Sequence, residues 1–176
     1  VRYAHHGDWP RPSHFLEPAG GGEVMAMDFY CWVAVGSGAI FIIDTGCDAD
    51  EAGRRGHDYL RSPIETLSAL GVDAVAATDL ILTHLHYDHV GNLAHFPAAT
   101  MHLQEQEIDF ATGPYMSERQ YSLAYCPEHV GAVIDAVEGG RVRLYDGDAC
   151  LAPGLSIHRV GGHTSGMQVV RVLTRR

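Results

Sequence analysis

The chain has 176 residues, of which 46% are hydrophobic and 19% are charged, a balance typical of one soluble globular domain. Its net charge of −10 argues against a nucleic-acid partner, which would require a basic patch, and no stretch approaches the roughly 18 apolar residues of a membrane span. All 12 cationic residues are Arg, which excludes Schiff-base chemistry and a phosphate-loop lysine.

The N-terminal part of the chain predicts an irregular arm followed by a hairpin. Residues 1–23 are rich in Pro, Gly and His, as expected of an arm or surface loop. The runs 29–36 and 39–46 are rich in aromatic and β-branched residues and flank a Gly-Ser-Gly turn, which predicts a β-hairpin. The second run is apolar on both faces as far as Asp44, as expected of a strand between two layers.

Helices and strands alternate in the middle of the chain. The stretch Ser62-Pro63-Ile64-Glu65 is a capping box with Pro at the first helical position, and Gly71 ends the predicted helix. A short buried strand is expected at 79–83, another strand at 100–103 and a short helix at 104–111. Residues 112–126 show no clean period, and their tyrosines suggest a partly ordered flap.

The last third of the chain predicts one more helix, at 127–137, and then short strands at 141–145, 155–160 and 167–173. The order is therefore β-rich, then α/β, then β-rich. It predicts an α/β fold in which sheets pack together with helices outside.

The cysteines and the N-terminus bear on the cellular compartment. The four cysteines are widely spaced and form no C-x-x-C pair, which predicts free thiols in a reducing cytoplasm (Cys31, Cys47, Cys126 and Cys150). The N-terminus lacks the apolar segment of a secretory signal, so we expect a cytoplasmic location. Because the chain begins at Val1, we expect that its start has been trimmed.

Four side chains capable of binding metal lie within six residues, in His84-x-His86-x-Asp88-His89 directly after a predicted buried strand. In an extended backbone, residues two apart point to the same side, so His84 and His86 can converge on one ion. Imidazole and carboxylate groups both suit zinc. Asp88 and His89 follow where the chain must turn, and they are placed to face a second ion. The sequence therefore predicts a metal site.

Other histidines carry no such pattern. Five of them are expected to be scattered over the surface: His5, His6, His14, His57 and His129.

The motif H-L-H-Y-D-H resembles the H-x-H-x-D-H signature of the metallo-β-lactamase superfamily. Residues 41–46, FIIDTG, are similar to the strand and turn that precede this signature, and residues 161–166, GGHTSG, to the family turn that supplies a third histidine. The resemblance implies an αββα sandwich spanning residues 24–176 of a single domain (1–176), with 1–23 as the N-terminal arm. The residues of these motifs are most similar to those of the N-acyl-homoserine lactonase group.

The resemblance also implies roles for individual residues. His84, His86 and His163 would hold the first ion, and Asp88 and His89 the second. Asp44 matches a position that orients the ligand loop, although an Asp that merely begins a turn is an equally good explanation. The implied cofactor is two zinc ions per complete protein, with iron or another divalent metal as alternatives. A metal-bound hydroxide would attack an ester carbonyl, and Asp88 would shuttle the proton.

The family pattern continues beyond the third histidine with a bridging Asp and a last His. This chain ends at Arg176, 13 residues after His163, and its last Asp is Asp148. We therefore expect a C-terminally incomplete chain, because residues 167–173 would otherwise end the fold with an unpaired edge strand. The alternative is a natively short protein with an incomplete second site.

The leading functional prediction is a zinc-dependent hydrolase of lactones or esters, plausibly N-acyl homoserine lactones in quorum quenching. Alternatives are a glyoxalase II-like thioesterase, an iron-dependent persulfide dioxygenase and a non-catalytic metal-binding remnant. The diiron redox branch usually carries Glu at the position of His86, which favours hydrolysis. A homodimer is compatible with exposed aromatic residues. Candidates to line an acyl pocket are Phe29, Tyr87 and Tyr115, together with Met25, Met27 and Tyr121.

Overall fold

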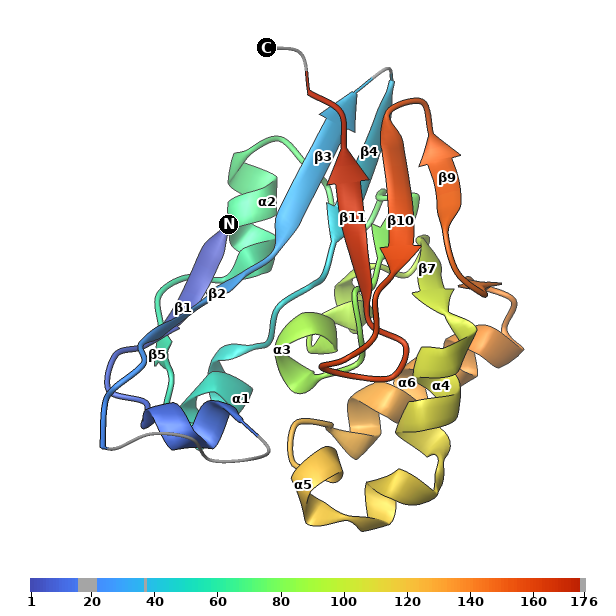
Figure 1. The fold of residues 1–176 in the computed structure, drawn as a ribbon. Coiled ribbons are helices and arrows are strands. Elements are labelled where there is room, and N and C mark those ends of the chain that lie inside the picture. Colours follow the sequence, from blue (N-terminus) through green and yellow to red (C-terminus); the bar gives the residue numbers. More distant parts are fainter. Residues whose placement is uncertain (16–21, 37, 175–176) are drawn as a thin grey trace.

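The computed structural model of the chain describes residues 1–15, 22–36 and 38–174 (Figure 1). Within them, strands form three sheets, and helices lie mainly on one side of the largest sheet. The strands are β1 (Arg2–His6), β2 (Met27–Tyr30), β3 (Trp32–Gly36), β4 (Ala39–Ile43), β5 (Asp58–Tyr59), β6 (Asp79–Ile81), β7 (Thr100–Gln104), β8 (Val142–Tyr145), β9 (Ala149–Ala152), β10 (Leu155–Arg159) and β11 (Gln168–Val172). The helices are α1 (Ala49–Arg54), α2 (Pro63–Ala69), α3 (Tyr87–Val90), α4 (Glu105–Thr112), α5 (Arg119–Ser122) and α6 (Pro127–Glu138), with 3-10 turns η1 (Arg11–His14), η2 (Leu93–His95) and η3 (Pro114–Ser117).

The central sheet has the strand order β3-β4-β6-β7-β8. Strands β3 and β4 form the predicted antiparallel hairpin, whereas β4, β6, β7 and β8 run parallel to one another. Side chains of β4 alternate between two cores: Ile42 packs with helices α2 and α6, and Phe41 and Ile43 pack with β10. This alternation explains why the run is apolar on both faces.

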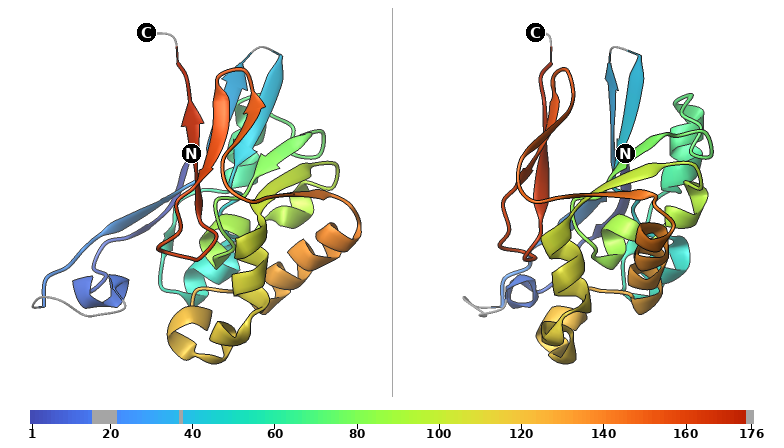
Figure 2. Two further views of the ribbon diagram at one scale, coloured as in Figure 1. Left: turned by 45° about the vertical axis from the view of Figure 1, so that its right-hand side comes forward. Right: turned by 90° about the vertical axis from the view of Figure 1, so that its right-hand side faces the viewer.

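Strands β9, β10 and β11 form a second, antiparallel sheet that packs on the central sheet. Figure 2 shows the resulting layers: the C-terminal sheet, the central sheet and the helices on the far side. Among the described residues, no helix covers the outer face of the C-terminal sheet. The described residues therefore form three layers of the predicted αββα sandwich: the helices, the central sheet and the C-terminal sheet.

The third sheet, β2-β1-β5, corrects the prediction that residues 1–23 form an irregular arm. Residues 2–6 are a strand, because the apolar side chains of Tyr3 and Ala4 are fully buried against Phe29 and Cys47. Residues 16–21 of the predicted arm lie outside the described residues. The predicted strand 29–36 is likewise divided at Cys31, with β2 in this sheet and β3 in the central one.

The predicted helix at 62–70 is confirmed. The side chain of Ser62 accepts a hydrogen bond from the backbone N–H of Glu65, as a capping box requires, and the helix ends before Gly71, whose φ is 78°. The short helix α1 was not predicted, although its cap is visible in the sequence: Asp48 accepts a hydrogen bond from the backbone N–H of Glu51.

Residues 112–126 are not a partly ordered flap but two helical turns, η3 and α5, that precede α6. The aromatic rings of Phe110, Tyr115 and Tyr121 pack together there. Strand β9 was also missed, because its four residues, Ala-Cys-Leu-Ala, include no β-branched or aromatic side chain. In the described part of the chain, none of the helices has the length and apolar character needed to cross a bilayer.

The interface between the two stacked sheets depends on Ile157, which is fully buried among Phe41, Ile43 and Ile81. We expect Ile157→Ala to lower the free energy of unfolding by about 2–5 kcal/mol, because it opens a cavity between the sheets. Urea denaturation measures this loss. The matched control is Ile40→Ala, at a side chain that is 39% exposed in β4, and an equal loss in the control would contradict the proposed importance of the interface.

Candidate metal centre

The metal-binding motif lies at the carboxyl ends of parallel strands. Asp44 directly follows β4, and Thr83 and His84 follow β6. The carboxyl ends of neighbouring parallel strands meet at one edge of a sheet, where α/β proteins place their sites. The loop between β10 and β11, residues 160–167, reaches over the same edge and brings His163 to it.

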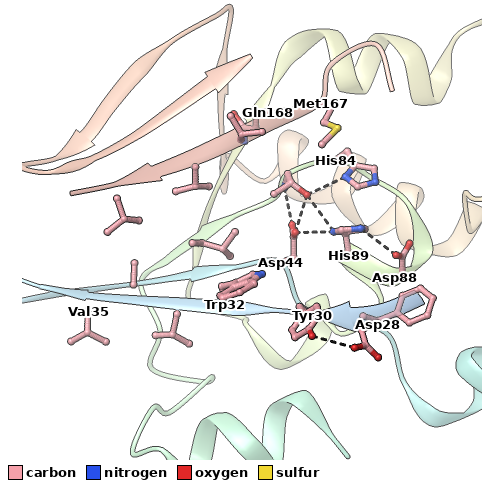
Figure 3. A pocket seen from close by; sticks show the side chains of 18 of the residues that line it. Asp28, Tyr30, Trp32, Val35, Asp44, His84, Asp88, His89, Met167 and Gln168 are labelled. Carbon is pink, nitrogen blue, oxygen red and sulfur yellow. Dashed lines mark hydrogen bonds and ion pairs between the residues drawn. The ribbon is translucent and has the colours of Figure 1, made fainter. Parts of the chain in front are cut away.

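The carboxylate of Asp44 holds this edge together (Figure 3). Its Oδ1 accepts a hydrogen bond from the backbone N–H of Thr83 at 2.7 Å. Its Oδ2 accepts from the Thr83 hydroxyl at 2.8 Å and from Nδ1 of His89 at 2.8 Å. Asp44 is buried and has a φ of 59°, a left-handed conformation that Asp adopts more readily than most residues. The structure thus places Asp44 beside the ligand loop.

The hydrogen bonds of Thr83 fix the orientation of His84. Because the Thr83 hydroxyl donates its proton to the carboxylate of Asp44, its oxygen accepts from Nδ1 of His84, 3.0 Å away. This leaves Nε2 of His84 as a lone-pair acceptor. That atom is buried and has no hydrogen-bond partner among the residues that the structure describes.

Two further imidazoles converge with His84 at this unpaired nitrogen. His84, His86 and His163 each offer a ligand atom, and these three atoms lie within 4.8 Å of one another. His84 and His86 are buried, and His163 is exposed. Three imidazole nitrogens that lie close together, one of them buried and unpaired, are the donor set of a metal site. These residues therefore fit a zinc ion or a similar divalent ion.

The three imidazoles are held neutral, the state that binds metal. Burial lowers the pKa of His84 well below its ordinary value, and the neighbouring imidazoles lower it further. Burial also lowers the pKa of His86 to about 3. The pKa of His163 is lowered too, again mainly by burial.

Asp88 and His89 form an ion pair beside the cluster, with Nε2 of His89 3.2 Å from Oδ2 of Asp88. Burial alone would raise the pKa of Asp88, but the charge and hydrogen bond of His89 bring it below its ordinary value. Conversely, burial would lower the pKa of His89, but Asp88 and Asp44 hold it well above its ordinary value. The His84 and His89 ring centres are 4.0 Å apart. Among the described residues, the group of three or more converging ligand atoms consists of His84, His86 and His163 and does not include Asp88 or His89.

A close contact explains a glycine of the motif. A Cβ added to Gly91 would lie 2.7 Å from Cα of Cys47 and 3.0 Å from the carbonyl oxygen of Gly46. The loop after the motif therefore packs directly on the turn that follows Asp44.

A cleft of about 880 Å³ opens beside the centre, between the edges of the two stacked sheets (Figure 3). Asp44, His84, Asp88 and His89 line its inner end, whereas His86 and His163 are outside its lining. Its walls are mostly apolar and include Met27, Phe29, Tyr30, Trp32 and Val33 from one side and Met167, Val169, Val170 and Val172 from the other.

The predicted acyl-pocket residues lie in different places. Phe29 and Met27 line the cleft. The Tyr87 side chain instead belongs to the N-terminal core, where its hydroxyl is 2.7 Å from Nε2 of His57. Tyr115 packs on Phe110, and neither it, Tyr121 nor Met25 belongs to the cleft lining.

The surface position expected for His57 was wrong. This imidazole is buried, stacks on Tyr87 and lies 2.9 Å from His6, Nδ1 to Nδ1. Several contributors to the site, Thr83 among them, were missed by sequence reasoning. Trp32 lines the cleft from the predicted hairpin, and Glu107 contacts the ligand loops from α4. Neither carries a local sequence signal, because each reaches the site through the fold alone.

The strand order and the imidazole cluster together define an α/β metal-binding protein. A sequence profile of the Metallo-beta-lactamase superfamily matches residues 30–175, so the chain belongs to this superfamily. The N-acyl homoserine lactonase AiiB of Agrobacterium fabrum is 28% identical over 145 residues, which cover 73% of this chain and 52% of the lactonase. The chain therefore spans about half the length of that relative.

Solved structures share the fold. A crystal structure of a quorum-quenching N-acyl homoserine lactone lactonase matches 98% of this chain and 68% of its own, with a TM-score of 0.67 and 17% identity. The dizinc quorum-quenching lactonase AidC matches 85% of this chain and 54% of its own, with a TM-score of 0.63 and 19% identity. At these identities the likeness establishes the fold alone.

The lowered pKa of His86 predicts a pH dependence of stability. The unfolded chain takes up a proton on His86 below its ordinary pKa of 6.5, whereas the folded chain does not until about pH 3. The free energy of unfolding of the metal-free protein should therefore fall as the pH falls from 6.5 toward 4. His89, whose pKa is raised, acts only above pH 6.5.

Urea denaturation in the presence of a chelator, repeated from pH 7 to pH 4, measures this dependence. We expect His86→Gln to reduce the slope of the free energy of unfolding against pH. The same change at the exposed His95 should leave that slope unaltered. Identical slopes in wild type and His86→Gln would show that His86 does not stay neutral in the fold.

Proposed function

We propose that this chain carries the metal-binding part of a metal-dependent hydrolase that opens lactone or ester bonds, with N-acyl homoserine lactones as its substrates. The observation that carries the proposal is the cluster of three imidazoles that includes the buried Nε2 of His84, an atom with no hydrogen-bond partner among the described residues. The similarity to a homoserine lactonase and the apolar cleft at the centre support the substrate class. The four free cysteines support a cytoplasmic location.

The residues of the centre fit the metal set of such an enzyme. We assign His84, His86 and His163 to one zinc ion, and Asp88 and His89 to a second. When bound, the ions would polarise the ester carbonyl and lower the pKa of a water molecule toward neutrality. Asp44 supports this arrangement because its hydrogen bonds fix Thr83 and the ring of His89.

We assign proton transfer to Asp88. Its side chain lies at the inner end of the cleft and is partly accessible there. The neighbouring imidazoles keep its pKa below the ordinary value, so the carboxylate is ionised at neutral pH and accepts a proton at Oδ2. It would then return that proton to the alkoxide that leaves when the ring opens.

The cleft would bind the acyl chain. Trp32 lies on one wall and Met167 on the other, with Asp44, His84 and Asp88 at the inner end (Figure 3), and Phe29 also lines the cleft. An acyl chain along these walls would bury apolar surface while the lactone ring reaches the metal ligands.

The first test combines metal binding and hydrolysis. We expect the purified protein to bind zinc and to release protons from an N-acyl homoserine lactone in a pH-stat, and His86→Ala to lose both properties. His95→Ala, at an exposed imidazole, is the control and should retain both. Turnover of a thioester but of no lactone would replace the substrate class, and full activity of His86→Ala would contradict the ligand assignment.

The cleft makes a separate prediction. Trp32→Ala should raise KM for a long-chain lactone by roughly 10-fold, about 1.4 kcal/mol of lost apolar contact, with kcat little changed. A short-chain lactone provides the internal control, because it would not reach Trp32. An equal rise in KM for both substrates would place the acyl chain elsewhere.

A further inference from the structure

A buried carboxylate outside the ligand motif contacts both loops that carry the imidazole cluster. Glu107 lies in the first turn of α4, just after β7, and its side chain is fully buried. Its Oε1 accepts hydrogen bonds from the backbone N–H of Leu85 at 3.0 Å and from the hydroxyl of Tyr125 at 3.1 Å. Its Oε2 accepts from the hydroxyl of Thr164 at 2.6 Å and from the backbone N–H of Gly166 at 3.1 Å.

Three of these four donors lie next to an imidazole of the cluster, and the fourth, Gly166, lies in the same loop as His163. Leu85 stands between His84 and His86 in the sequence, and Thr164 directly follows His163. Tyr125 lies edge-on to His86, with ring centres 4.6 Å apart. Thr164 and Gly166 are 57 and 59 residues away from Glu107 in the sequence. One carboxylate therefore joins the loop that contains these two residues to the loop of the motif, through Leu85.

We propose that Glu107 is a positioning residue that clamps the His84–His86 loop to the His163 loop and so sets the geometry of the imidazole cluster. This inference rests on the proposed metal centre, but not on the proposed lactone substrate. Glu107 is not assigned a contact with metal or substrate.

The chemistry of the contacts supports a clamp. Two of the four donors are backbone N–H groups, which can only donate, so each carboxylate oxygen receives at least one fixed hydrogen bond. Hydrogen bonds to a buried carboxylate are charge-assisted and are stronger than bonds between neutral groups. Loss of the carboxylate would leave four buried donors to find other partners.

The backbone geometry at Gly166 supports the clamp independently. A Cβ added to Gly166 would lie 2.1 Å from the backbone nitrogen of Glu107 and 2.5 Å from its Cα. The His163 loop therefore rests directly on the start of α4, at the residue that supplies the carboxylate. Sequence reasoning identified the glycines around His163 but not the element against which they pack.

The test is metal affinity, measured by titration with cobalt(II) alone and by the visible spectrum of the cobalt form. We expect Glu107→Gln to weaken metal affinity by roughly 10- to 100-fold, the usual effect of removing a group that orients a metal ligand, and to alter the cobalt spectrum. Glu105→Gln is the matched control, the same change on the exposed side of the same helix, and should match wild type. Circular dichroism of the metal-free proteins separates these effects from loss of fold.

Two milder variants keep the test decisive if Glu107→Gln does not fold. Thr164→Val and Tyr125→Phe each remove one hydroxyl donor to Glu107 with little change of shape. Each should weaken cobalt binding several-fold. Their effects should also be less than additive with that of Glu107→Gln if the latter folds, because they act through the same carboxylate.

The outcomes distinguish this inference from the proposed function. Folded variants that bind cobalt with wild-type affinity and spectrum would overturn the clamp. A wild-type protein that binds no cobalt would overturn both the metal centre and the clamp. If wild type binds cobalt and the variants behave as expected, but no lactone is opened, the clamp stands and the substrate proposal falls.

Discussion

The carboxylate of Asp44 is the interaction on which the rest of the centre depends. It accepts a hydrogen bond from the Thr83 hydroxyl, so the oxygen of that hydroxyl accepts from Nδ1 of His84, and the lone pair of His84 Nε2 faces the other imidazoles. It also accepts from Nδ1 of His89, which turns the opposite side of that ring toward Asp88. A single buried carboxylate thus selects the tautomer of one imidazole and, together with Asp88, favours the protonated state of another.

This arrangement is possible because of where the sheet ends. Strands β4, β6 and β7 run parallel and deliver Asp44, Thr83 and Glu107 to the same edge. Polar groups buried at such an edge are costly unless each finds a partner. The carboxylates of Asp44 and Glu107 are fully supplied with donors, whereas Nε2 of His84 has no hydrogen-bond partner among the described residues. This unpaired atom lies where the three imidazoles meet, so a bound ion would remove the cost of burying it.

The sequence predicted the parts of the site that are local in the chain. His84, His86, Asp88 and His89 follow one another within one loop, and the Ser62 capping box is complete within four residues. The sequence did not reveal Glu107, because its partners Leu85 and Thr164 are distant in the chain and an acidic residue in a first helical turn is ordinary.

The errors in the predicted fold have similar physical causes. Strand β1 was taken for an irregular arm because its five residues show little periodicity and are followed by Gly7 and Pro10, and only packing of Tyr3 and Ala4 against the rest of the fold reveals their burial. Helices α1 and α5 span six and four residues, which is too few for a helical period to appear. His57 was placed on the surface because burial of a single imidazole depends on long-range neighbours.

The direct contact between Gly166 and the start of α4 has a consequence for how this centre can change during evolution. The spacing between the two halves of the centre is set there by backbone against backbone, with no side chain between them. Substitutions elsewhere can reshape side-chain packing without altering that spacing. The cleft walls at Trp32, Val35 and Val169 are made of side chains on edge strands and carry no such restriction. The geometry of the metal-binding imidazoles and the shape of the cleft therefore depend on different contacts. Substitutions can change the cleft while the imidazoles remain in place.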